Sequence, residues 1–233
     1  MLTYMRKLSP KSPSPRIPAA ARKASIIRSA AAIFGEKGFN GTKTREIAAR
    51  AGVSEALIFK HFPSKEDLYA AILTEKSPLP GLLERIKTLV EQRKDVEVFT
   101  MIAETIVGGA PDPNLMRLIL FSALESHELS DMFFQNHIRD FYDVLASYIE
   151  QRIEDGAFKP VPPLVAARAF MGMLIYHRLL TVLFRAPLTQ KPKDIVHTFV
   201  TVFMDGLTRQ SSQSKKRKPQ TRTSKGSKKK QLS

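Results

Sequence analysis

The sequence predicts an all-α protein, with an N-terminal three-helix domain that contains a helix-turn-helix, a larger helical domain after it, and disordered basic tails. Residues 42–66 read as two short helices joined at Gly52 and followed by the start of a third. Beyond residue 72 the apolar residues recur at helical spacing, and no convincing period-two alternation marks a strand. The excess positive charge lies at the two ends of the chain, which hold too few apolar residues to form a core.

The first expected helix is amphipathic and runs from Ala19 to Glu36. Gly38 and Gly41 follow it, and glycines in such positions commonly end a helix. Its apolar stripe consists of Ile26, Ala30, Ile33 and Phe34. This helix is expected to cover the apolar side of the helix pair that comes next.

Two short helices are expected between residues 44 and 62. Thr44 is expected to cap the first, and Gly52 ends it because glycine adopts the left-handed conformation of a sharp turn without a steric penalty. Ser54 is expected to cap the second helix. Its residues Ile58 and Phe62 share one face, which predicts that the opposite face is free to contact a partner.

A further helix is expected to begin at about Lys65. Pro63 ends the helix before it, because proline cannot continue the backbone hydrogen bonding. Ser64 is a good cap, and the acidic residues Glu66 and Asp67 suit the positive end of the helix dipole.

At this point the chain resembles the N-terminal domain of the TetR/AcrR family of bacterial transcriptional regulators. The family pattern contains a Gly-Phe turn, a threonine, Ile-Ala, Ala-Gly-Val-Ser, and then an aromatic residue, His-Phe and Ser-Lys-Glu. The residues that match it without a gap are Phe34, Gly38, Phe39, Thr42, Thr44, Ile47, Ala48, Ala51, Gly52, Val53, Ser54, Phe59, His61, Phe62, Ser64, Lys65, Glu66 and Leu68. The resemblance implies a regulator that binds a palindromic operator as a homodimer and responds to a small hydrophobic effector.

The resemblance also implies which residues contact double-stranded DNA. Phosphate contacts are expected from Thr44 and Arg45 and from the basic residues of the second helix and the third helix start, whereas Glu55, Ala56 and Leu57 would face base edges. The full set is Thr42, Lys43, Thr44, Arg45, Ser54, Glu55, Ala56, Leu57, Phe59, Lys60, His61 and Lys65. Many relatives carry Gly-Thr-Leu-Tyr at residues 56–59. Here Phe59 lacks a hydroxyl for a phosphate and Leu57 offers only apolar surface, so both bear on the choice of operator.

The formal net charge of +15 equals the excess of basic residues in the two ends of the chain, residues 1–23 and 211–233. Residues 1–23 and 211–233 contain many lysines and arginines and no acid, whereas the acidic and basic residues between them balance. Two readings of the tails have equal weight: they bind DNA phosphates without sequence preference, or they are solvated and dispensable. If they dominated binding, the protein would instead be a nucleoid-type DNA-binding protein.

The rest of the chain is expected to be helical over 82–92, 96–107, 113–126, 129–154, 163–184 and 193–207, with breaks at glycine and proline clusters. The last two helices are apolar over too wide an arc for a single core contact, which predicts a dimer face. The residues predicted for it are Phe170, Leu174, Ile195, Phe199, Phe203 and Leu207. A membrane span over 163–184 is disfavoured because Arg168, His177 and Arg178 interrupt it.

An effector pocket is predicted from methionines and aromatics, which adapt to varied apolar shapes. The residues proposed to line it are Phe99, Phe121, Phe134, Phe141, Tyr142, Met171, His177 and Arg178. Ordinary core packing is the competing interpretation for the apolar members. His177 and Arg178 need a polar partner on an otherwise apolar helix, either across the dimer or on an anionic ligand.

Several function classes are excluded or disfavoured by the sequence. The absence of cysteine excludes disulfides, thiolate metal sites and cysteine nucleophiles. The histidines and the loose group at 125–137 lack the tight spacing of a metal site, and no motif of an enzyme or cofactor site is found. No secretory signal is evident, so a cytoplasmic location is expected. The expected division is 1–18 head, 19–73 DNA-binding domain, 74–210 effector-binding and dimerisation domain, and 211–233 tail.

Overall fold

The structure is a computed structural model that describes residues 18–110, 112–124, 131 and 134–209. These residues form helices and turns without any strand, and one isolated bridge pairs Phe158 with Thr208. The predicted all-α fold is therefore confirmed for this part of the chain. The tails that we expected to be disordered lie outside the described residues.

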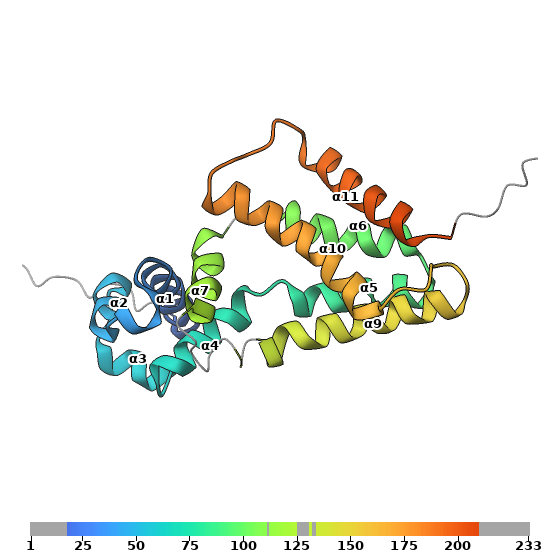
Figure 1. Ribbon diagram of the computed structural model, residues 1–233. Coiled ribbons are helices and arrows are strands. Elements are labelled where there is room, and N and C mark those ends of the chain that lie inside the picture. The colour runs from blue at the N-terminus through green and yellow to red at the C-terminus, as the bar shows by residue number, and fades with distance from the viewer. Residues whose placement is uncertain (1–17, 111, 125–130, 132–133, 210–233) are drawn as a thin grey trace, which may run out of the picture.

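Four helices form one end of the molecule (Figure 1): α1 (Ala19–Gly41), α2 (Thr44–Ala51), α3 (Glu55–His61) and α4 (Lys65–Lys76). The predicted break after the first helix is confirmed, because Gly38 has φ 72° and ψ 178° and interrupts α1 there. The hydroxyl of Thr42 donates to the carbonyl of Gly38 at 2.7 Å and so stabilises the turn into α2.

The remaining helices agree closely with the predicted ranges. They are α5 (Leu79–Glu91), α6 (Asp95–Val107), α7 (Pro113–Leu124), η1 (Phe134–Ile138), α9 (Arg139–Glu154), α10 (Pro163–Arg178), η2 (Leu179–Leu183) and α11 (Pro192–Leu207). The two segments labelled η are π-helical, which the sequence did not indicate. In η2 the hydroxyl of Thr181 donates to the carbonyls of His177 and Arg178, a side-chain contact that competes with regular helical bonding.

Two apolar clusters form the core. The first unites α1 to α4 around Phe34, Phe39 and Tyr69, whose ring centroids lie 5.4 to 5.6 Å apart. The second unites α5, α6, α9, α10 and α11. At its centre the Phe99 ring lies 5.0 Å from that of Phe170 and 4.9 Å from that of Phe203.

Helix α7 belongs to the first cluster and also contacts η2. It packs along α1, and Leu118 is buried within the first cluster although it lies far beyond that cluster in sequence. The hydroxyl of Tyr69 donates to the carbonyl of Leu118 at 2.7 Å. Gly35 approaches the backbone of Asn114 so closely that an added Cβ would lie 3.0 Å from its Cα. The N-terminal helices are therefore packed directly against α7.

The opposite end of the second cluster is held by a polar network. Arg152 of α9 forms two hydrogen bonds with the carboxylate of Asp95, at 2.8 and 2.9 Å, and a third with Asp155. The hydroxyl of Tyr148 also donates to Asp95. Burial and this hydrogen bond raise the pKa of Tyr148. The network fixes α6 against α9.

One helical stretch, Pro163–Leu183, is long and apolar enough to cross a membrane by length and composition. A single such helix is weak support for a membrane protein, since core helices of other proteins pass the same test. Several of its residues pack in the second cluster: Ala167, Phe170, Met171 and Leu174.

Candidate DNA interface and regulatory region

The turn between α2 and α3 has the geometry that the sequence predicted. Gly52 is left-handed, with φ 68° and ψ 35°, and its N–H bonds the end of α2. The hydroxyl of Ser54 accepts a hydrogen bond from the backbone N–H of Leu57 at 3.2 Å and caps α3. Both predicted roles are confirmed, and they set the direction in which α3 leaves the turn.

Helix α3 has one buried face and one exposed face. Ile58 and Phe62 are 1% and 3% exposed within the first cluster, as predicted. Exposed on the other side are Glu55, Ala56, Phe59 and Lys60, with Leu57 and His61 partly exposed. An aromatic ring that is 44% exposed, as Phe59 is, offers apolar surface to a partner.

The start of α2 corrects two predictions. Lys43 occupies the cap position without a side-chain hydrogen bond, and Thr44 is the first helical residue, so Thr44 does not cap the helix. Thr42 is only 3% exposed, and its hydroxyl donates a hydrogen bond to the carbonyl of Gly38. Thr42 therefore stabilises the turn and is not available for DNA. Lys43 and Arg45 are exposed, and they remain predicted phosphate contacts.

The predicted cap of the fourth helix is confirmed. Ser64 and Asp67 form a reciprocal capping box, in which each side chain accepts from the other residue's backbone N–H. Lys65 lies beside this cap, with its Nζ 4.3 Å from the centroid of the Phe39 ring. The cation therefore rests on an aromatic face at the edge of the first cluster.

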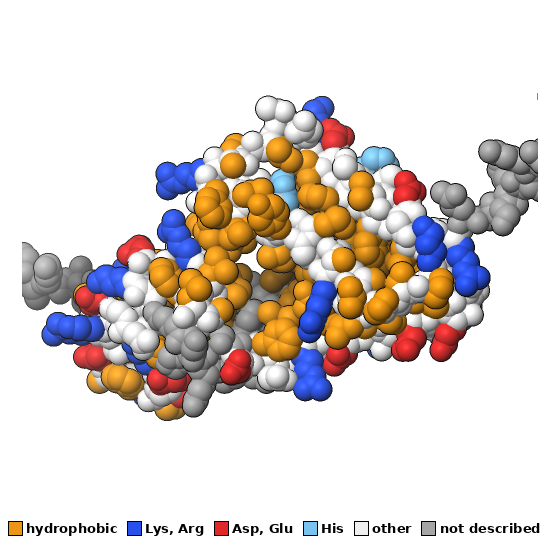
Figure 2. Space-filling view, in the orientation of Figure 1, with side chains coloured by type: hydrophobic (Ala, Val, Ile, Leu, Met, Phe, Trp, Pro, Cys, Tyr) orange, Lys and Arg blue, Asp and Glu red, His pale blue; other side chains and the backbone are white. Residues whose placement is uncertain are grey.

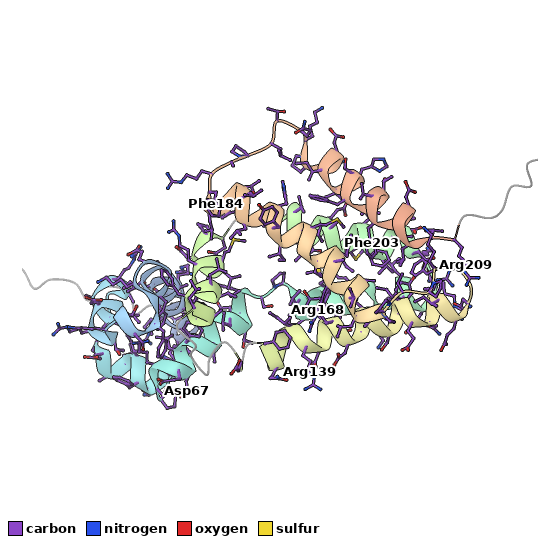
Figure 3. The ribbon with its side chains drawn as sticks, in the orientation of Figure 1. Asp67, Arg139, Arg168, Phe184, Phe203 and Arg209 are labelled. Atoms are coloured by element: carbon purple, nitrogen blue, oxygen red, sulfur yellow. The ribbon has the colours of Figure 1, made fainter. Side chains whose placement is uncertain are left out.

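The structure corrects four of the six residues predicted for the dimer face. Phe170 and Leu174 are fully buried, and Phe203 and Leu207 are 9% and 4% exposed, all within the second cluster of the same chain. Figure 3 shows Phe203 between α11 and its neighbouring helices. Ile195 and Phe199 are partly buried against that cluster. A helix with two apolar faces gives no sequence signal for which face is inside.

The opposite side of α10 and α11 carries an outer apolar face. Figure 2 shows hydrophobic side chains gathered over these helices. The side chains that define this face are Leu164, Val165, Ile175, Tyr176 and Val202, which are 39%, 62%, 47%, 61% and 59% exposed. An apolar surface of this kind marks an interaction site. Arg168 lies on the same side of α10, and its guanidinium is 5.9 Å from the Tyr142 ring centroid (Figure 3).

The residues predicted to line an effector pocket divide into two groups. Phe99, Phe141 and Met171 are buried by core side chains, so the structure assigns them to packing. The other five side chains, all partly or more fully exposed, are Phe121, Phe134, Tyr142, His177 and Arg178. Burial raises the pKa of Tyr142.

His177 and Arg178 lie at the end of α10, where the helix becomes π-helical. The His177 ring contacts that of Phe199, with centroids 5.5 Å apart. A guanidinium nitrogen of Arg178 lies 3.5 Å from the carbonyl of Val107, at the end of α6, and no described carboxylate forms an ion pair with Arg178. Burial lowers the pKa of both residues, and the charge of Arg178 lowers that of His177 further.

Helix α7 presents different faces to the two parts of the molecule. Leu118 and Ser122 are buried toward the N-terminal helices, whereas Leu120 and Leu124 are 39% and 81% exposed on the other side. Figure 2 shows a hollow with apolar side chains around it between α7 and α10. A ligand in this hollow would touch a helix that is attached to the candidate DNA interface.

Among the described residues, no group of three metal-ligating side chains is close enough to hold an ion. Most of the loose histidine and carboxylate group at 125–137 lies outside them.

Comparison with known proteins agrees with this arrangement. Residues 26–72 match the family model described as "Bacterial regulatory proteins, tetR family", and residues 107–206 match "AefR-like transcriptional repressor, C-terminal domain". The chain is 31% identical over 107 residues to the HTH-type transcriptional regulator RutR of Escherichia coli (strain K12), a match that covers 39% of this chain and 50% of the relative. The chain thus spans about half the length of this curated relative.

Solved structures share the fold over most of their length. The transcriptional regulator FadR from Bacillus subtilis, in complex with stearoyl-CoA, has a TM-score of 0.61 and 19% identity, covering 78% of this chain and 98% of that one. AibR, in complex with isovaleryl coenzyme A and operator DNA, has a TM-score of 0.59 and 20% identity, with coverages of 78% and 97%.

Proposed function

Because the chain belongs to the TetR family of bacterial regulatory proteins, we propose that it is a sequence-specific DNA-binding transcriptional regulator. The observation that carries this proposal is the exposed face of α3, which a left-handed Gly52 and the Ser54 cap hold away from the first cluster. A short helix whose outer face is exposed and partly charged suits the major groove of DNA. Its base contacts would come from Glu55, Ala56 and Leu57.

The regulator would act as a homodimer through the outer apolar face. That face runs along α10, where Arg168 interrupts it, and includes Val202 of α11, so two copies would cover each other's apolar side chains about a two-fold axis. The two copies of α3 would then enter successive major grooves about one DNA turn, roughly 34–36 Å, apart. An inverted-repeat operator follows from that symmetry.

We propose that a small apolar effector binds in the hollow between α7 and α10 and changes the spacing of the two α3 helices. Two neighbours in fold are seen with coenzyme A thioesters. A ligand with an apolar chain and an anionic group would match the exposed leucines of α7 and the cation of Arg178, which has no described carboxylate partner. Because α7 is attached to α1 and Tyr69, movement of α7 would tilt the DNA-binding helices.

The finer assignments follow from this role. We propose a repressor that works in the cytoplasm, has no catalytic activity, and divides near residue 73 into DNA-binding and effector-binding parts. The nucleoid-type alternative is not favoured, because the family matches cover 26–72 and 107–206 and leave the basic tails outside.

The test is selection of bound duplexes from a random pool by the full chain, at near-physiological salt with competitor DNA. An enriched inverted repeat is the expected result, and enrichment of no sequence would refute a specific regulator. Adding stearoyl-CoA or isovaleryl-CoA to the selected complex then tests the effector class. A fall in operator affinity of about tenfold, within the usual range of allosteric coupling, is expected from a matching ligand. Arg178→Gln should reduce that response.

A further inference from the structure

Helix α3 carries one acidic side chain, Glu55, on the surface that we propose to lie in a groove of DNA. Figure 1 shows α3 at the outer end of the molecule, beside α2 and α4. Glu55 is exposed there. Because DNA is a polyanion, a carboxylate at this place opposes binding to every sequence unless it gains a specific contact.

The charge of Glu55 is not offset within the chain, in contrast to acids of the two preceding helices. Lys37 donates to Glu46 at 3.0 Å, and Arg50 donates to Glu36 at 3.2 Å. In the part of the chain that the structure describes, the Glu55 side chain forms neither a hydrogen bond nor an ion pair. Its carboxylate is therefore available to a partner outside the chain.

The first turn of α3 is held in a fixed geometry. The hydroxyl of Ser54 accepts from the N–H of Leu57 at 3.2 Å. Ala56 is two residues from the buried Ile58, and two residues turn a helix by about 200°, so Ala56 lies near the middle of the outer face. Its side chain is a single carbon, which lets the backbone of α3 approach the floor of a groove. The longer Glu55 side chain, on the flank of this turn, then reaches a base edge.

The hydrogen-bonding chemistry of a carboxylate discriminates among the four bases. An ionised carboxylate only accepts hydrogen bonds. In the major groove guanine and thymine present acceptors, and adenine presents the acceptor N7 beside its amino group, whereas cytosine presents the amino donor N4. A carboxylate that reaches a base edge is therefore attracted by cytosine and repelled by the acceptors of the other bases.

No other residue in the first turn of α3 competes for this role. The residue types that pair bidentately with guanine or adenine through arginine, asparagine or glutamine are absent from this helix. Its lysine, Lys60, is five residues beyond Glu55, which is about 7.5 Å along the axis. Ala56 and Leu57 carry no polar side-chain atoms. Glu55 thus supplies the polar base contact of this turn.

We propose that Glu55 selects a cytosine at one position in each half-site and penalises other sequences, so that it contributes selectivity and lowers general affinity. The inference rests on the proposed DNA-binding function and deepens it by naming the base. A purely structural Glu55, which stabilised the positive end of the α3 dipole, would have no base preference.

The experiment selects bound duplexes from a random pool with the full chain and with three variants: E55Q, E55A and E66Q. Glutamine keeps the size of Glu55, removes its charge and pairs with N6 and N7 of adenine. Glu66, in the first turn of α4, is exposed and has no described partner, so E66Q is the matched control that removes the same charge elsewhere. Matching circular-dichroism melting curves show that all four proteins are folded alike.

The E55Q profile should contain adenine in place of cytosine, on the same strand and at one position in each half of the inverted repeat. E55A should lose the preference for cytosine without gaining one for adenine, and E66Q should keep cytosine. On the cytosine duplex the affinity of E55Q should fall roughly tenfold relative to the unchanged chain. On an unrelated duplex it should rise by about twofold, because one repulsive charge is removed.

An inverted repeat in which no cytosine responds to E55Q or E55A would overturn this inference and leave the proposed regulator intact. Weaker binding of E55Q to the operator and to the unrelated duplex alike would also overturn it, since that result indicates a structural role. If the full chain enriches no sequence at all, the proposed regulator fails, and this inference fails with it. The flat profile distinguishes that outcome from the first two.

Discussion

Helices α3 and α10 each bury one face and expose the other, but the chemistry of the exposed faces is opposite. In α3 the buried Ile58 stands against an outer side that carries Glu55 and Lys60. In α10 the buried Phe170 stands against an outer side that carries Val165 and Tyr176. A polar outer face is stable in water and is free to bind DNA, whereas an apolar one of this size calls for a protein partner. The difference separates the proposed reading helix from the proposed dimer helix.

The largest effect should come from the inner face of α10. Phe170→Ala removes a fully buried ring that contacts Phe99 and Phe203, and it should lower the free energy of unfolding by about 3–5 kcal/mol. Urea unfolding followed by circular dichroism measures this. If Phe170 belonged to the dimer face instead, the variant would form a stable monomer.

A large effect on assembly, with folding preserved, should come from the outer face. Val202→Asp places a charge among the exposed apolar side chains of α10 and α11, so we expect a helical monomer in sedimentation velocity. Its affinity for the inverted repeat should fall by roughly a hundredfold or more, because a monomer contacts only one half-site at a time. Val96 is 54% exposed on α6, outside this face, and Val96→Asp is the matched control that should stay dimeric. If the V202D protein remained dimeric, the dimer interface would have to lie on another face of the molecule.

An intermediate effect is expected at the turn that aims α3. Gly52→Ala forces a side chain into φ 68° and should lower stability by about 1–2 kcal/mol, although the added Cβ meets no atom within 4 Å. Gly81→Ala in α5 also meets no atom but lies in helical backbone, and it should raise stability by up to about 1 kcal/mol. If G52A lowers the melting temperature and G81A raises it, the cost of G52A comes from the left-handed backbone conformation of Gly52. Equal shifts in the two variants would contradict that explanation.

The smallest effect concerns His177, at the end of α10. Burial and the charge of Arg178 lower its pKa below the ordinary value of 6.5. The unfolded chain therefore binds a proton more readily, so this residue makes the protein less stable as the pH falls from about 7 to 5. His177→Gln should flatten the dependence of the melting temperature on pH in that window. An unchanged slope would show that the histidine is not responsible.

The same contrast explains how much could be predicted from the sequence. Around α3 the polar and apolar residues separate cleanly, and Gly52, Ser54 and Asp67 have specific local roles, so the turn and caps were predictable. Thr42 and Thr44 were harder, because the bond from Thr42 to Gly38 depends on how α1 ends. The DNA contacts themselves stay predictions.

In α10 and α11 the apolar residues span a wider arc than a single core contact needs. Periodicity therefore identified a helix with two apolar faces but could not say that Phe203 is inside and Val202 outside. Contacts between distant segments were also invisible in the sequence, such as the hydrogen bond from Tyr69 to Leu118. Nor did the sequence distinguish core residues such as Phe99 from accessible ones such as Phe121.

The most direct test of the central claim is to compare the operator profile of the full chain with those of Glu55→Ala and Leu57→Ala. We predict an inverted repeat with half-sites about one turn apart, and each substitution should relax the same base position in both halves, costing about 1–3 kcal/mol of discrimination. An operator profile that neither substitution changes, or a site without repeated halves, would contradict the claim that two symmetric copies of α3 read the DNA.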